Sequence, residues 1–159
     1  MKPFYHGSRH RLPVGEVLRA RTNEGWFRKP IEEAVEEGRL AAVPSRLSSF
    51  FLVDDRKEIS VAGGSTDYVY RVKPIGVYSK HHHGWLGNVY DAMMPFIRHG
   101  ARQEEKDAAT PMLVHIGEWV HNYWEGVPYR HRPNQAKSTW EFLAPEILVE
   151  EELSAPFGL

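Results

Sequence analysis

Residues 140–153 read WEFLAPEILVEEEL, and this stretch decides the fold class. Two short apolar runs, at 140–143 and 146–153, flank Ala144-Pro145 and predict two strands that follow one another directly. A doubly wound parallel sheet would place a helix between successive strands. The stretch therefore favours an α+β fold.

Three further short strands are predicted nearer the start of the chain. The first ends at His6, just before a Gly-Ser turn. The second covers residues 48–53, whose run Ser-Ser-Phe-Phe-Leu-Val is typical of a buried strand. The third covers residues 68–72, which alternate at the period of a half-buried strand, and it ends at Pro74.

Helical signals occur at two places. Residues 30–38 begin with proline, carry two acids in the first turn and end with glycine, the order expected of a short helix. Residues 110–126 open with Thr-Pro, place apolar residues at helical spacing and also end with glycine. Residues 79–109 contain Pro95 and begin without periodicity, so we expect mostly loop there, with short helical pieces.

The composition limits the possible functions. A length of 159 residues favours a single domain over residues 1–159. Lys and Arg number 20 against 21 Asp and Glu, so the chain lacks the general cationic field of a protein that grips nucleic acid through phosphates alone. The absence of cysteine excludes a disulfide scaffold, a thiol nucleophile and cysteine-based zinc sites. No apolar run suits a secretory signal or a membrane span, and we expect a cytoplasmic protein with no membrane partner.

Two polar segments could carry chemistry, but a structural interpretation is favoured for each. Adjacent residues on an extended chain point to alternate faces, so His81-His82-His83 is a poor metal site; we expect an exposed polar loop there and no metal. The segment Tyr129-Arg130-His131-Arg132, with Lys137 nearby, could hold phosphates beside a stacking aromatic ring, although a solvated loop is the favoured explanation.

An ordered set of short motifs is more informative. Tyr5-His6-Gly7-Ser8 is followed by Leu12, Gly15 and Leu18, then by Ser49-Phe50-Phe51-Leu52-Val53-Asp54-Asp55, by residues 68–76, by Tyr123-Trp124-Glu125-Gly126 and by Glu141-Phe142-Leu143-Ala144-Pro145. In this order the motifs resemble those of the ADP-ribosyltransferase superfamily, in particular the branch with a leading histidine that includes rifampin-inactivating enzymes and many phage and toxin relatives. The resemblance covers about residues 4–150.

The resemblance implies a fold and an activity. The fold would be a split β-sheet core with flanking helices. The activity would be NAD-dependent ADP-ribosyl transfer, with NAD as substrate, a protein or nucleic acid as acceptor, no metal, and in some settings a cognate inhibitor. A toxin-like relative would act in the cytoplasm of a target cell. The long region 79–135 fits no cofactor motif and is where we expect target recognition.

The resemblance also assigns roles to single residues. Glu141 would stabilise the cationic ribose, His6 would bind the adenine-side ribose, and Phe50 would stack the nicotinamide, which makes these three the expected catalytic residues. Phe50 stands where relatives usually carry tyrosine, and residues 77–80 lack the acid found after the corresponding strand of the rifampin enzymes. The expected NAD-binding residues are Tyr5, His6, Gly7, Ser8, Arg9, Ser49, Phe50, Phe51 and Tyr70, with Arg9, Arg46 and Arg71 as candidates for the pyrophosphate.

Two other functions stay open at this point. An NAD-dependent RNA 2′-phosphotransferase would share the superfamily fold, and Arg130 and Arg132 would suit its RNA phosphate. A non-catalytic module that binds a nucleotide or a partner protein is the other, because Phe50 lacks the hydroxyl of the usual tyrosine.

Overall fold

The computed structural model describes residues 2–23, 27–135 and 138–153, in which the strands form two antiparallel sheets. The four-stranded sheet has the order β1-β4-β7-β2, with bounds Phe4–Ser8, Tyr68–Pro74, Glu146–Leu153 and Val17–Arg19. The three-stranded sheet has the order β3-β6-β5, with bounds Phe50–Leu52, Trp140–Ala144 and Ser79–His82. Tyr5 and Val53 join the two sheets through an antiparallel bridge.

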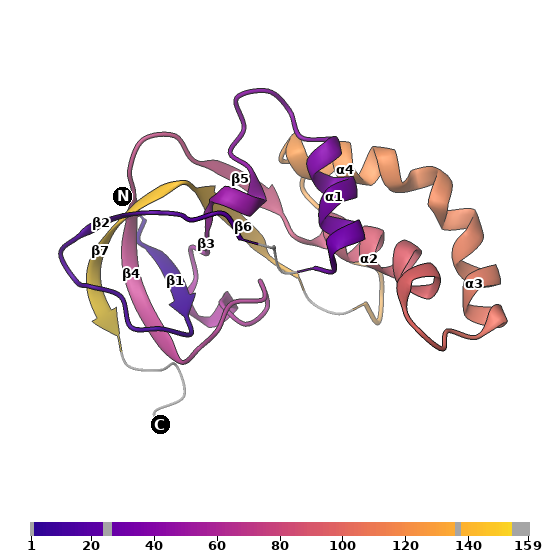
Figure 1. Cartoon of the computed structure of the whole chain (residues 1–159), viewed down its shortest axis with the longest axis horizontal. Coiled ribbons are helices and arrows are strands. Elements are labelled where there is room, and N and C mark those ends of the chain that lie inside the picture. Colours follow the sequence, from indigo (N-terminus) through magenta and orange to yellow (C-terminus); the bar gives the residue numbers. More distant parts are fainter. Residues whose placement is uncertain (1, 24–26, 136–137, 154–159) are drawn as a thin grey trace.

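The helices gather on one side of the molecule, away from the four-stranded sheet (Figure 1). The α-helices are α1 (Lys29–Glu37), α2 (Gly84–Ile97), α3 (Gln103–Ala109) and α4 (Ile116–Trp124). The described residues also form three short 3₁₀ segments: η1 (Arg46–Ser48), η2 (Arg56–Glu58) and η3 (Thr110–His115). The expected α+β class and the two C-terminal strands are confirmed.

The three-stranded sheet lies between the other two layers of the fold. On β6, Leu143 packs into a cluster with α1, α2 and α4, whereas Phe142 and Ala144 pack against the four-stranded sheet. Since neighbouring residues on a strand face opposite sides, Glu141 shares the helix-facing side of β6 with Leu143. This placement brings a carboxylate into the layer between β6 and the helices.

Helix α1 follows the expected pattern. Pro30 lies in its first turn, where a missing backbone N–H costs nothing, and Gly38 follows its end. Ile31 and Val35 are fully buried one turn apart, and the carbonyl of Val35 accepts a hydrogen bond from the Trp124 indole at 2.7 Å. The inner face of α1 is thereby fixed against α4.

The expectation of mostly loop over residues 79–109 is wrong. The segment contains β5, the 14-residue helix α2 and helix α3. Pro95 does not break α2, because it lies in the last turn of the helix, where only one hydrogen bond is lost. The helix expected over residues 110–126 is shorter in the structure. Its α-helical part begins at Ile116, and residues 110–115, with Pro111 near their start, form a 3₁₀ segment.

The three histidines at 81–83 are buried, so the expectation of an exposed polar loop at these positions is wrong. Their relative exposures are 1%, 6% and 7%. His81 and His82 end β5, and His83 directly precedes α2. No helix of the described residues is long and apolar enough to cross a membrane.

Candidate functional site

A groove of about 610 Å³ lies at the seam between the two sheets, a volume within the range of small-molecule sites. The end of β1 and the start of β3 form its walls, together with the turn around residues 62–65. Its lining includes seven of the expected site residues: His6, Gly7, Ser8, Arg9, Ser49, Phe50 and Phe51. The two motifs, more than forty positions apart in sequence, therefore meet in one place.

His6 is fixed by the neighbouring sheet. Its Nδ1 lies 2.9 Å from the carbonyl oxygen of Phe51, and because a carbonyl can only accept, Nδ1 carries the proton. Burial lowers the pKa of His6, so the ring is neutral at pH 7 and Nε2 is a hydrogen-bond acceptor. The ring also meets Phe50 edge to face, with centroids 5.4 Å apart.

Gly7 has a structural requirement of its own. A Cβ at this position would lie 1.9 Å from the carbonyl oxygen of Ser65 and 2.7 Å from the side chain of Ile59. Any side chain would therefore displace the turn that forms one wall of the groove. The glycine is explained by this close backbone approach, without reference to a ligand.

Phe50 and Phe51 line the groove together, although they belong to different layers. Phe50 packs with the four-stranded sheet and Phe51 with the helices. Ser49 beside them is 3% exposed, and its hydroxyl finds no hydrogen-bond partner in the part of the chain that the structure describes. A buried hydroxyl without a partner is costly, and a polar ligand group in the groove would satisfy it.

The groove is cationic. Arg9, Arg21 and Arg46 belong to its lining, and no aspartate or glutamate is among the described lining residues. A site of this charge suits an anionic ligand such as a phosphate ester.

Arg46 connects the groove to a buried charged cluster. Its guanidinium binds both carboxylate oxygens of Glu32, at 3.1 and 3.2 Å, and donates from Nη1 to the Tyr123 hydroxyl at 2.8 Å. Nη1 also lies 2.5 Å from Oε1 of Glu141. The guanidinium carbon stands 4.9 Å from the centre of the Phe51 ring. One side chain thus links α1, α4, β6 and the wall of the groove.

Glu141 lies directly behind Arg46, outside the groove lining. Its Oε1 also accepts from the Tyr123 hydroxyl at 2.5 Å, whereas Oε2 has no hydrogen-bond partner among the described residues. Burial acts to raise the pKa of Glu141, but the Arg46 guanidinium opposes it and holds the pKa below its usual value. Glu141 is therefore a buried, ionised carboxylate.

Three of the expected NAD-binding residues do not line the groove. Tyr70 is fully buried in the core, and its hydroxyl accepts from the backbone N–H of Leu12 at 2.7 Å. Tyr5 is half-buried against a small apolar cluster near Val53. Arg71 on β4 forms an ion pair with Glu151 on the neighbouring strand β7, at 3.0 Å, and borders a different hollow.

Sequence reasoning missed Glu32 and Tyr123 as members of the cluster. The position of Glu32 in the first turn of α1 suggested only a favourable interaction with the helix dipole. Glu32 does, however, directly follow the buried Ile31 and precede the buried Val35 by three positions, which places it on the buried face. A carboxylate on an apolar helix face indicates a buried cationic partner.

The histidines at 81–83 find partners within the protein. His81 donates from Nδ1 to the carbonyl of Tyr123 and accepts at Nε2 from Ser79, both at 2.7 Å. His82 accepts from the backbone N–H of Gly84 at 3.1 Å. No group of three metal-ligating side chains was found in the described residues. These contacts explain the histidines as structural.

The basic segment at 129–132 is partly structural. The Tyr129 hydroxyl donates to Asn88 at 2.8 Å, and His131 lies 2.7 Å from the Ser138 hydroxyl. Arg130 and Arg132 are exposed. Lys137, the other member of the sequence motif, lies outside the described residues.

Comparison of the chain with protein-family models, with curated proteins and with solved structures finds no match.

Proposed function

We propose that this protein is an NAD-dependent ADP-ribosyltransferase whose NAD site is the groove at the seam of the two sheets. The observation that carries the proposal is the meeting of residues 6–9 with residues 49–51 in one cationic groove. These residues belong to two of the motifs that carry the resemblance to the superfamily. A pyrophosphate, a ribose and an aromatic ring are the chemical groups that such a lining suits.

Each part of the groove supplies a contact that NAD needs. Nε2 of His6 is an acceptor suited to a ribose hydroxyl, and the exposed face of Phe50 or Phe51 is suited to the nicotinamide ring. Arg9 is the expected lining residue with charge for the pyrophosphate, and Arg21 also belongs to the lining. The unpaired hydroxyl of Ser49 adds a donor at the same wall.

In the proposed reaction the bond between the ribose and nicotinamide breaks, and its electron pair leaves with the nicotinamide nitrogen. The acceptor nucleophile forms the new bond to the same ribose carbon and loses a proton. Positive charge develops on the ribose in the transition state, so a nearby carboxylate lowers the barrier. We assign that role to Glu141, which is ionised and has one unpaired oxygen behind Arg46.

The test is to incubate the purified chain with NAD labelled in the adenine, with and without cell lysate, and to follow both nicotinamide release and labelled macromolecule. The product is then treated with protease or with nuclease. Loss of label after protease identifies a protein acceptor, and loss after nuclease identifies nucleic acid. His6→Ala should lose activity and NAD affinity, whereas Arg71→Ala, outside the groove, should keep both. Absence of nicotinamide release under every condition would refute the proposed activity.

A non-catalytic nucleotide-binding module is the second candidate, and the burial of Glu141 favours it. The carboxylate is 1% exposed and is separated from the groove by Arg46. This candidate requires saturable NAD binding that His6→Ala weakens, without cleavage of NAD in any lysate fraction.

A further inference from the structure

We infer that Glu32 sets the charge specificity of the groove: together with Glu141 it outweighs the single cation of Arg46, and the net negative charge favours the cationic ring of an oxidised nicotinamide nucleotide over the uncharged ring of the reduced form. The inference rests on the proposed function, because it concerns the ligand of the same groove. It adds a specificity-determining residue that does not itself line the groove.

The geometry around Arg46 is the first step of the argument. Glu32 binds the guanidinium in a two-pronged manner through Nε and Nη2, the arrangement in which arginine and carboxylate pair most strongly. Glu141 receives one hydrogen bond from Nη1 of the same guanidinium and a second from the Tyr123 hydroxyl. One guanidinium is therefore shared by two carboxylates.

The charge of the cluster is the second step. Its two carboxylates and one guanidinium are 2%, 1% and 1% exposed, so water screens them little. Burial lowers the pKa of His81 and His83 against the opposing effect of Glu141, and burial raises that of Tyr123, so these three neighbours are uncharged at pH 7. The three charged side chains of the cluster together carry one negative charge.

The position of that charge is the third step. Arg46 is a member of the cluster, and the ring of Phe51 lies against its guanidinium. Both residues line the groove. Without the charge of Glu32, the charges of Arg46 and Glu141 would cancel. With Glu32 in place, a ring that carries a positive charge is attracted by the net negative charge of the cluster.

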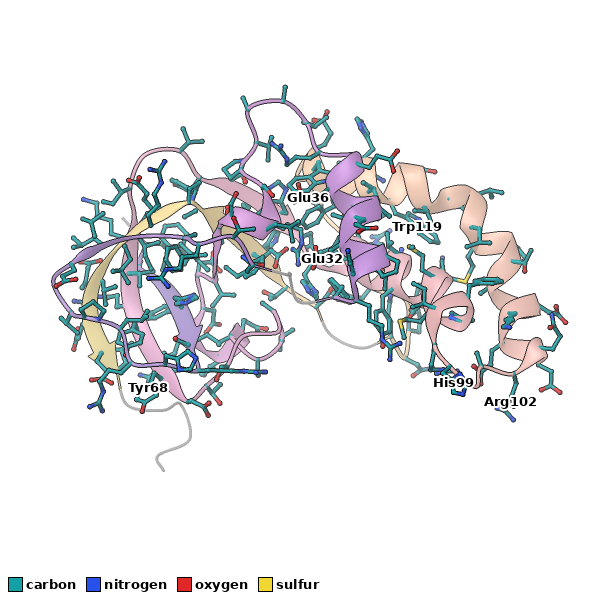
Figure 2. The ribbon with its side chains drawn as sticks, in the orientation of Figure 1. Glu32, Glu36, Tyr68, His99, Arg102 and Trp119 are labelled. Carbon is teal, nitrogen blue, oxygen red and sulfur yellow. The ribbon has the colours of Figure 1, made fainter. Side chains whose placement is uncertain are left out.

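Helix α1 also supplies a matched control. Glu36 follows Glu32 by one turn of the helix (Figure 2) and accepts hydrogen bonds from the backbone N–H of Arg46 and from the hydroxyl of Ser45. Glu36 thus binds the segment that carries Arg46, but in the contacts described it does not bind the Arg46 guanidinium. Glu32→Gln and Glu36→Gln remove the same charge from the same helix, but only the first changes the compensation of Arg46.

The experiment measures the dissociation constants of NAD⁺ and NADH for the wild-type chain and its variants by tryptophan fluorescence, within seconds of mixing so that turnover does not contribute. We expect the wild type to prefer NAD⁺ and Glu32→Gln to lower that preference about tenfold, the Coulomb effect of one unit charge taken at about 12 Å and an effective dielectric constant of about 20. Glu36→Gln should leave the preference unchanged.

A second variant keeps the test valid if Glu32→Gln alone does not fold. Glu32→Asp keeps a carboxylate and its charge at the same position of α1, so the cluster retains its single negative charge. We expect this variant to retain the wild-type preference for NAD⁺, and loss of the preference there would overturn the inference. An unchanged preference in folded Glu32→Gln, or an equal loss in Glu36→Gln, would overturn it as well. If neither nucleotide binds the wild type, the proposed function itself is refuted.

Discussion

The stability of the fold should depend strongly on Arg46. Its guanidinium is buried and binds Glu32, Glu141 and Tyr123, so Arg46→Ala leaves two buried carboxylates without this cation. Breaking a buried ion pair from one side costs about 3–5 kcal/mol, a large part of the roughly 5–15 kcal/mol that holds a typical domain folded. For a chain of this size the melting temperature should fall by about 6–20 °C.

The loss should also depend on pH. Because Arg46 holds the pKa of Glu141 below its usual value against the opposite effect of burial, the pairing stabilises the fold at pH values above the unfolded pKa, which is about 4.3. That stabilisation is lost as the pH falls through the lower, folded-state value. In Arg46→Ala, burial acts on Glu141 without this opposing charge and raises its pKa above the usual value, so protonation relieves the unpaired charge. The difference in unfolding free energy between wild type and Arg46→Ala should therefore narrow as the pH is lowered from 7 to 4.

Urea unfolding followed by tryptophan fluorescence at both pH values measures this difference. Arg71→Ala is the control, because Arg71 and Glu151 form an ion pair in which both side chains are more than two-fifths exposed, and such pairs contribute at most about 1 kcal/mol. A loss in Arg46→Ala no larger than that in Arg71→Ala, or one that is the same at pH 7 and pH 4, would refute the reasoning.

Three further predictions concern the site and its surroundings. Glu141→Gln should still bind NAD, with the lower preference for NAD⁺ expected of Glu32→Gln, but it should raise the barrier to nicotinamide release by about 3 kcal/mol, more than a hundredfold in rate, and near-normal turnover would remove Glu141 from the catalytic role. Gly7→Ala should destabilise the fold by about 1–3 kcal/mol in thermal melting because its Cβ meets a backbone oxygen at 1.9 Å, whereas Gly87→Ala, where a Cβ meets nothing within 4 Å, should not. Burial lowers the pKa of His82 to about 4, so its ring signals in NMR should titrate near pH 4, and its contribution to stability should decline as the pH falls from 6.5 towards 4.

The sequence predicted the elements whose signals are local. Proline and glycine mark both ends of α1, and Pro145 separates β6 from β7, as expected from their residue types alone. Helix α2 was missed because Gly84, Gly87 and Pro95 weaken its pattern, although its buried side chains pack against α4. Packing between distant segments outweighed the weak local propensity there.

The same distinction applies to the site. The motif at residues 5–8 and the run at 49–51 could be singled out because their residues adjoin in sequence. The cluster of Glu32, Arg46 and Glu141 could not, since its members come from three elements and become neighbours only in the fold. The polarity of His81 suggested exposure, but a polar ring can be buried where a carbonyl and a hydroxyl satisfy both nitrogens.

The seam between the two sheets has a consequence for motion. At this seam Tyr5 and Val53 exchange backbone hydrogen bonds of 2.8 and 3.0 Å, and His6 adds one to Phe51. Fraying at this edge breaks these three bonds, at a net cost of about 0.5–1.5 kcal/mol each, and leaves in place the apolar cluster that packs the two sheets together. Local opening of the molecule is therefore expected to begin at the groove. A ligand that contacts both walls would hold them together and slow amide hydrogen exchange at Tyr5 and Val53.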